Sequence, residues 1–297
     1  MIISKPPLVS VIIPAYNRAG SIGRSLQSVL NQSLHDFEIV VVDDASSDNT
    51  PTVIQSFADE RIRLLRHQRN RGPGPARNTA MQAALGQYIA WLDSDDEWFP
   101  DKLQVQLDAL RNAASHYRAS YTAYEIVQQD VSKIHFSPES DLKQLFLGCD
   151  KAPGATLLFE RALIEEVGLL DESMRRNQDW DWLLRYSKQY RLLGVNRPLA
   201  RIYYSPNKSA ANVESSALVF VSKHSEYLRR YGIFRNKVIS KRWMEVASSY
   251  AQEANFGKMV SYVFKSFSVY PFPPLNVWGW LVKEIVGVRF SYKFMKR

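Results

Sequence analysis

The sequence of 297 residues contains a single cysteine, Cys149. One cysteine excludes a disulfide framework and a zinc site built from several cysteines. A chain of this length can bury a full hydrophobic core without such cross-links. The sequence also lacks any apolar run of about 18 residues, so it contains no candidate transmembrane helix. Because its first residues lack the pattern of a secretory signal, we expect a cytoplasmic protein.

Acidic residues are scarce in the last third of the chain. Residues 201–297 contain 16 Lys and Arg but only 5 Asp and Glu, whereas residues 1–200 contain 22 and 25. The formal charge of +8 therefore belongs to a basic tail behind a slightly acidic body. This distribution argues against nucleic acid as a partner of the body. The 5 histidines show no spacing typical of metal ligands, and we expect none of them to be catalytic.

Short apolar runs alternate with helical patterns in the first 100 residues. Strands are predicted at 9–14, 37–42, 62–65 and 88–92, and helices at 21–32, 50–58 and 75–85. This alternation predicts β-α-β units in an α/β fold with a mostly parallel central sheet flanked by helices. Beyond residue 100, helices are predicted at 101–114, 161–168 and 179–190, strands at 119–127 and 154–160, and a polar loop at 128–141. Past residue 206 the chain is predicted to be helical.

Polar clusters follow three of the predicted strands: Tyr16-Asn17, Asp43-Asp44 and Asp93-Ser94-Asp95-Asp96. Because ligands bind beyond the carboxyl ends of parallel strands, we expect these clusters to meet. Two carboxylates in a D-x-D turn suit Mg²⁺ or Mn²⁺, which neutralises a leaving diphosphate. The alternative for these residues is an acidic turn that caps the next helix.

The other two clusters suit a nucleoside. The Asp43-Asp44 pair can accept hydrogen bonds from a base or a ribose, and Tyr16 can stack on a base. The alternatives are a turn that leads into a helix cap for the two carboxylates, and a buried aromatic at the sheet edge for Tyr16.

Two further segments contain candidate site residues. Residues 69–78 form a Gly/Pro loop with three arginines ahead of a helix, an arrangement that suits phosphate. This loop matches neither a dinucleotide fingerprint nor a P-loop, and a solvated basic loop is the alternative. Residues 178–182 (QDWDW) place two carboxylates among aromatic residues, which can raise a carboxylate pKa toward that of a general base. The alternative there is a helix start with Asp179 as its N-cap.

Together these segments resemble the family-2 glycosyltransferases with the GT-A fold. The resemblance spans roughly residues 8–205 and rests on VSVIIPAYNR (9–18), SLQSVLNQ (25–32), FEIVVVDDASSDNT (37–50), NRGPGPARNTA (70–80), YIAWLDSDDEWFPDKL (88–103) and VGLLDE…QDWDWLLR (167–185). It implies a GT-A domain over 1–205, with a Rossmann-like nucleotide-sugar half at about 8–100 and an acceptor half at about 101–205. A helical C-terminal region follows at 206–297.

The resemblance also implies an activity and a role for each candidate residue. An inverting transferase would move a sugar from a nucleotide diphosphate-sugar, often a UDP-sugar, to an acceptor hydroxyl, in the synthesis of a cell-surface polysaccharide or glycolipid. Mn²⁺ or Mg²⁺ would be the cofactor. The implied donor site consists of Pro14, Ala15, Tyr16, Asp43, Asp44, Arg77, Asp93 and Ser94, with Asp95 at the metal.

On the acceptor side, the resemblance implies that Asp179 deprotonates the acceptor hydroxyl. Gln178, Trp180 and Asp181 are expected near the acceptor or the sugar. Gln178 stands where the family usually has glutamate, which bears on the choice of acceptor.

The tail mixes basic and aromatic residues over 215–297, with Trp278 and Trp280 near Lys283, Arg289 and Lys293. This composition suits an anionic membrane surface, where a lipid-linked acceptor would lie. Alternatively, the tryptophans pack on the body or in a homo-oligomer contact. Two other functions remain open: a sugar-phosphate nucleotidyltransferase, for which PAYNRAGS is a poor triphosphate loop, and a non-catalytic protein that binds nucleotide-sugars or a membrane.

Overall fold

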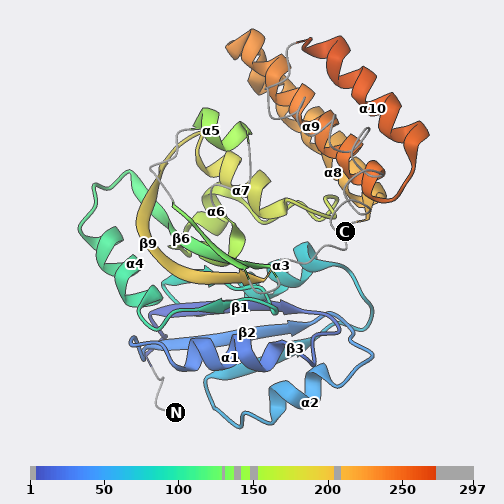
Figure 1. Ribbon diagram of the computed structural model, residues 1–297. Helices are drawn as coiled ribbons and strands as arrows, with labels where there is room; N and C mark the ends of the chain where they lie inside the picture. Colours follow the sequence, from blue (N-terminus) through green and yellow to red (C-terminus); the bar gives the residue numbers. More distant parts are fainter. Residues whose placement is uncertain (1–4, 129–130, 137–141, 148–152, 204–208, 272–297) are drawn as a thin grey trace, which may run out of the picture. The chain divides into compact units, whose positions relative to one another are not determined.

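The computed structural model describes residues 5–128, 131–136, 142–147, 153–203 and 209–271 (Figure 1). The chain divides into two compact units, Met1–Ser205 and Pro206–Arg297. Over the described ranges, none of the helices has the length and apolar character needed to cross a membrane. Trp278, Trp280, Lys283, Arg289 and Lys293 of the predicted tail lie outside the described residues.

Four parallel strands, in the order β3-β2-β1-β4, form the first half of the sheet in the first unit. They are β1 (Val9–Ala15), β2 (Phe37–Asp43), β3 (Ile62–Arg66) and β4 (Tyr88–Trp91), connected by α1 (Ile22–Leu30), α2 (Thr50–Gln55) and α3 (Pro73–Ala83). β1 and β2 are buried along their whole length, as expected of strands covered on both faces. The predicted strands and helices of this half are confirmed, with ends that differ by a few residues.

The second half of the sheet is mainly antiparallel and continues the order as β4-β8-β6-β9-β5. Its strands are β5 (Glu97–Trp98), β6 (Tyr117–Gln128), β7 (Val131–His135), β8 (Leu158–Glu160) and β9 (Arg191–Tyr203). β6 and β9 pair in parallel, so the complete sheet is mixed. The predicted polar loop at 128–141 is wrong over β7, which pairs with β6, and the predicted strand at 154–160 begins instead with a 3₁₀ turn.

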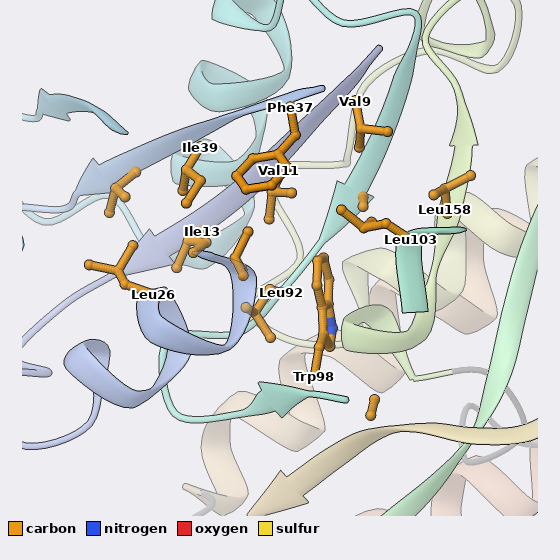
Figure 2. Packing of buried hydrophobic residues seen from close by; sticks show 14 of the residues in the cluster. Val9, Val11, Ile13, Leu26, Phe37, Ile39, Leu92, Trp98, Leu103 and Leu158 are labelled. Atoms are coloured by element: carbon orange, nitrogen blue, oxygen red, sulfur yellow. The ribbon is translucent and has the colours of Figure 1, made fainter. Parts of the chain in front are cut away.

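One hydrophobic core joins the two halves of the sheet. Figure 2 shows Leu26 of α1 beside Ile13 of β1, and Trp98 close to Leu92. Leu103 and Leu158 belong to the same cluster of buried residues. The helices of the second half are α4 (Lys102–Arg111), α5 (Leu142–Leu147), α6 (Leu163–Val167) and α7 (Gln178–Tyr186). The shared core holds the ends of β1 and β4 in fixed positions relative to the second half.

Over its described residues, 209–271, the second unit is helical, as predicted, with α8 (Ala210–Leu228), α9 (Ile233–Gln252) and α10 (Phe256–Val269). Glu214 of α8 accepts hydrogen bonds from Tyr250, Lys258 and Tyr262. Burial acts to raise the pKa of Glu214, but these hydrogen bonds outweigh it and lower the pKa to about 2. The carboxylate therefore stays ionised and links the three helices.

Candidate functional site

A cleft of about 530 Å³ opens at the carboxyl ends of β1 and β4. In the sheet, β2 lies on one side of β1 and β4 lies on the other. The connections that follow β1 and β4 therefore diverge, which leaves a crevice at the ends of these two strands. Most of the predicted site residues line this cleft: Pro14, Ala15, Tyr16, Asp44, Arg77, Asp93, Ser94, Asp95, Gln178 and Asp179. Tyr16 is 44% exposed, so it is not a buried edge aromatic and its ring is available for stacking.

Helix α1 holds the D-x-D turn in place through side chains that the sequence analysis did not identify. The Ser21 and Ser25 hydroxyls donate to the carbonyls of Ser94 (2.9 Å) and Asp96 (2.6 Å), and Arg24 donates to the carbonyl of Asp95 (2.6 Å). Ser25 is fully buried on the mainly apolar face of α1, which also includes Ser28. A buried serine on such a face was the signal available in the sequence. The turn is thereby fixed through its backbone, which leaves the carboxylates of Asp93 and Asp95 at the cleft.

Arginines neutralise part of the negative charge in the cleft. Arg77, on α3, forms an ion pair with Asp93, and an Arg18 nitrogen lies 3.3 Å from a carboxylate oxygen of Asp95. Burial alone lowers the pKa of Arg77, but the charges of Asp93 and Asp179 outweigh it and raise the pKa. Arg77 is only 7% exposed and its pKa is raised. The site therefore contains a buried side chain that stays positively charged.

Asp179 lies at the start of α7 and faces the same cleft. Its Oδ2 accepts from the backbone N–H of Gly154 (3.1 Å) and its Oδ1 from that of Trp180 (2.8 Å). Burial raises the pKa of Asp179, Arg77 opposes this shift, and the charge of Asp93 adds to it. A Cβ at position 154 would lie 2.9 Å from Oδ2, so only glycine allows this close approach. The N-cap of α7 is Asn177, so Asp179 does not cap the helix.

Gln178 is the first residue of α7, and its side chain bonds back to the loop that precedes the helix. Its side chain is buried, and Nε2 donates to the carbonyl of Met174 (2.7 Å). A glutamate at this position would set a carboxylate against that carbonyl oxygen, which repels it. The conformation of this loop therefore favours an amide over a carboxylate at position 178.

The other two residues predicted near the acceptor lie in the core instead of the cleft. Trp180 is almost fully buried, and its indole N–H donates to the carbonyl of Leu145 (2.6 Å). Asp181 is fully buried and accepts from Arg185 (3.0 Å). Adjacent residues on a helix point in different directions, so only part of the QDWDW segment can face one cleft.

Asp44 and Asp43 both hold loops. Asp44 Oδ1 accepts from His67 Nδ1 (2.6 Å) and from the N–H of Arg71 (2.9 Å), and Oδ2 accepts from the N–H of Gly72 (2.6 Å). These bonds take most of the acceptor capacity of a carboxylate. Asp43, predicted in the donor site, does not line the cleft: it is fully buried, accepts from the N–H of Ser46 (3.2 Å) and lies 3.0 Å from Arg66.

His67 is a positioning residue that the sequence analysis did not identify. With Nδ1–H donating to Asp44, its Nε2 accepts from the Thr79 hydroxyl (3.0 Å), so the ring connects the loop that follows β2 to α3. Its side chain is 9% exposed, and it does not line the cleft. It therefore acts on the cleft through Asp44 and the start of α3.

We expect His67→Phe to raise the KM for the donor about 10-fold with a smaller change in kcat. The substitution keeps a ring but removes two partly buried hydrogen bonds, each of which costs about 1–3 kcal/mol when its partner is left unpaired. Steady-state kinetics would separate the two parameters, with His67→Gln restoring part of the affinity and the exposed His35→Gln as the control. Equal donor KM values in His67→Phe and wild type would contradict this role.

The carboxylates at the cleft fit a divalent cation that binds together with the donor. Among the described residues no group of three or more His, Cys, Asp or Glu side chains is arranged to hold a metal by itself. Mg²⁺ and Mn²⁺ commonly take one or two carboxylates and complete their shell with substrate phosphates and water. Asp95, with Asp93 nearby, supplies hard oxygen ligands of this kind.

The family model described as "Glycosyl transferase family 2" matches residues 10–166 of the chain. The chain belongs to this glycosyltransferase family. A Bacillus subtilis (strain 168) relative, provisionally named as the teichuronic acid biosynthesis glycosyltransferase TuaG, is 35% identical over 218 residues, which cover 69% of this chain and 82% of TuaG. The Escherichia coli enzyme WfgD, named as a UDP-Glc:α-D-GlcNAc-diphosphoundecaprenol β-1,3-glucosyltransferase, is 31% identical over 246 residues, which cover 71% of this chain and 95% of WfgD.

The family membership agrees with the architecture. A solved structure of the mannosyltransferase PcManGT from Pyrobaculum calidifontis, in complex with GDP-Man and Mn²⁺, superposes with a TM-score of 0.62 at 18% identity. The superposition covers 99% of this chain and 89% of that one. The expected GT-A glycosyltransferase fold is thereby confirmed.

Proposed function

We propose that this family-2 glycosyltransferase is an inverting enzyme that transfers a sugar from a UDP-sugar to a lipid-linked sugar acceptor in cell-surface glycan synthesis. One observation carries the proposal: a single cleft brings together Tyr16, the Asp93–Asp95 turn, Arg77 and Asp179. The likeness to WfgD, whose name includes a UDP-sugar and a diphospholipid acceptor, supports the substrate classes.

We assign different residues of the cleft to different parts of the donor. We assign the base and ribose to Pro14–Tyr16, with Asp44 holding the loop beside them, and the ribose side also to Asp93 and Ser94. Asp95 would hold Mn²⁺ or Mg²⁺ against the diphosphate, and the bound cation supplies positive charge that stabilises the leaving nucleoside diphosphate. The Mn²⁺ in the PcManGT complex supports a cation in this role.

Asp179 is the proposed general base. It would accept the proton of the acceptor hydroxyl while the hydroxyl oxygen attacks the anomeric carbon in line with the leaving diphosphate, which inverts the anomeric centre. The Gly154 and Trp180 N–H groups fix both of its oxygens, and burial raises its pKa toward the range of an effective base. Arg77 balances the charges of Asp93 and Asp179.

Thermal-shift screening of nucleotides and nucleotide-sugars, with and without Mn²⁺, tests the donor class. A ligand at 100 times its Kd stabilises the native state by about 2.7 kcal/mol, so UDP with Mn²⁺ is expected to raise the Tm and GDP to raise it less. Release of pyrophosphate from a nucleoside triphosphate and a sugar phosphate would favour a nucleotidyltransferase instead. UDP-sugar binding without any transfer, unaffected by Asp179→Asn, would indicate a non-catalytic binding protein.

We also propose that the C-terminal unit binds an anionic membrane surface, where a lipid-linked acceptor would lie. Phe256, Val260 and Phe264 repeat every four residues along α10, so they share one side of the helix, and the two phenylalanines are 60% and 71% exposed. The opposite side, with Met259 and Tyr262, is buried. Residues 209–271 contain 9 Lys and Arg against 4 Glu, a balance that suits anionic lipid.

Replacing both Phe256 and Phe264 by Ser is expected to weaken binding to phosphatidylglycerol-containing vesicles at least 10-fold. Burying one phenylalanine contributes about 1.5–3 kcal/mol. Sedimentation with vesicles measures the change, and Phe136→Ser in the first unit, where Phe136 is 63% exposed, is the matched control. Unchanged vesicle binding by the double variant, together with a loss of self-association, would assign this surface to an oligomer contact instead.

A further inference from the structure

A separate hollow of about 320 Å³ adjoins the cleft described above. Its lining consists of Arg69, Asn70, Arg71, Pro75, Glu172 and Arg175, and we refer to it as the arginine hollow. Asn70 and Arg175 line both the arginine hollow and the cleft. A ligand in the arginine hollow would therefore lie next to the reacting groups.

The walls of the arginine hollow are held together by Asn78 of α3. Its Nδ2 donates to Glu172 Oε1 (3.0 Å) and to the carbonyl of Leu170 (3.0 Å), and its Oδ1 accepts from the N–H of Leu170 (2.9 Å). On the other side, the Arg175 guanidinium lies against Gly72, where a Cβ would be 3.4 Å from Nη1. Gly72 has φ of +98°, a conformation that favours glycine. The hollow is thus formed by two connected segments.

Positive charge exceeds negative charge in the arginine hollow. Its three guanidinium groups face one carboxylate, Glu172, which lies 3.1 Å from Arg71. Across the ranges that the structure describes, Arg69 and Arg175 have no carboxylate within 4.0 Å. The positive charges around the arginine hollow repel one another. An anion that binds between them reduces this repulsion, so its binding is electrostatically favourable. The planar guanidinium fork matches pairs of phosphate oxygens.

We infer that the arginine hollow binds a phosphate group of the acceptor, an assignment that rests on the proposed function. The proposed function assigns the donor to the cleft, with its diphosphate at the Asp93–Asp95 turn, so the arginine hollow is left for another group. Arg175 precedes Asp179 by four residues in the same segment, and the reacting hydroxyl of the acceptor must lie at Asp179. With a volume of about 320 Å³, the hollow suits a small charged group, such as the phosphate that links a sugar to a lipid, rather than a sugar chain.

Two variants with opposite expected effects test this assignment. Arg69→Gln with Arg71→Gln removes positive charge, and Glu172→Gln removes the opposing negative charge while keeping an oxygen that accepts from Asn78. Isothermal titration of hexyl diphosphate into the full-length protein saturated with UDP and Mn²⁺ is expected to show at least 10-fold weaker binding in the first variant and several-fold tighter binding in the second. The control variant, Arg111→Gln with Lys133→Gln, removes the same amount of charge at residues that line neither the cleft nor the arginine hollow. Its affinity for hexyl diphosphate should equal that of the wild type.

Other outcomes overturn the assignment in distinguishable ways. Equal hexyl diphosphate affinity in wild type and the Arg69/Arg71 variant excludes the arginine hollow as the binding site. A loss of UDP affinity as large as the loss of hexyl diphosphate affinity assigns it to the donor diphosphate. Inorganic phosphate binding as tightly as hexyl diphosphate would indicate a free-phosphate site. If wild type binds no UDP at all, the proposed function fails instead.

Discussion

Asp179→Asn is expected to lower kcat for sugar transfer about 10³-fold, while the affinity for the UDP-sugar changes less than about 3-fold. A positioned general base contributes roughly 10²–10⁴-fold, and the amide cannot accept the hydroxyl proton at neutral pH. The loss should therefore appear in kcat and not in donor binding. Transfer assays combined with titration of UDP measure the two quantities separately.

Asp181→Asn is the matched control for this prediction, because it changes the same residue type two positions further along α7. Asp181 is fully buried in an ion pair with Arg185, 3.0 Å away, and lies outside the cleft. Breaking a buried ion pair destabilises a protein, so this variant should have a lower Tm but should retain turnover in the folded fraction. If Asp179→Asn transfers sugar at the wild-type rate, Asp179 is not the base.

The pH dependence provides a second test of the same residue. Since burial raises the pKa of Asp179, the rise of kcat with pH should come at higher pH than for an ordinary aspartate. Arg77 lowers this pKa, so Arg77→Met should move the rise to still higher pH.

The raised pKa also has a consequence for stability. The folded protein holds the proton of Asp179 more tightly than the unfolded chain does. Its contribution to stability is therefore present below the unfolded pKa and is lost as pH rises through the folded pKa. Denaturation of wild type and Asp179→Asn as a function of pH should show this loss in wild type alone.

The parallel half of the fold could be predicted from the sequence because local patterns determine it. β1, β2 and β4 are short, mainly apolar runs, and each is followed by polar residues that line the cleft. β3 (IRLLR) is less apolar, but its three aliphatic residues still mark it as a strand. β9 could not be recognised, because Arg191–Tyr203 mixes arginines, Asn196 and Pro198, and its pairing with β6 has irregular register. Its neighbours in the sheet, rather than its own sequence, make it a strand.

The sequence predicts the site residues that are proposed to contact the donor, the cation or the acceptor. It does not predict the residues that only hold those residues in position. Asp95 and Asp179 are recognisable by their chemistry and their motifs. The bond from His67 to Asp44 joins residues 23 positions apart, and Ser25 supports a turn 71 positions away. These contacts depend on how the strands and helices pack against one another, which cannot be predicted from a short motif.

Removing divalent cations with EDTA is expected to lower transfer at least about 10²-fold, with recovery on adding Mn²⁺ or Mg²⁺. The charge that develops on the leaving diphosphate is too large for Arg77 alone, since this arginine already balances Asp93 and Asp179. Asp95→Asn should raise the Mn²⁺ concentration needed for half-maximal activity at least 10-fold. Asp96→Asn is the control, because Asp96 is buried, accepts from the N–H of Tyr203 (2.9 Å) and does not line the cleft.

Arg18 makes this prediction more specific. Its guanidinium lies 3.3 Å from Asp95, so a cation bound at Asp95 would compete with the arginine for the same carboxylate. Arg18→Gln should therefore lower the Mn²⁺ concentration for half-maximal activity by a few-fold, since exposed ion pairs are worth about 0–1 kcal/mol. Opposite shifts for Asp95→Asn and Arg18→Gln would place the cation at Asp95, whereas full activity after treatment with EDTA would show that the arginines alone stabilise the leaving group.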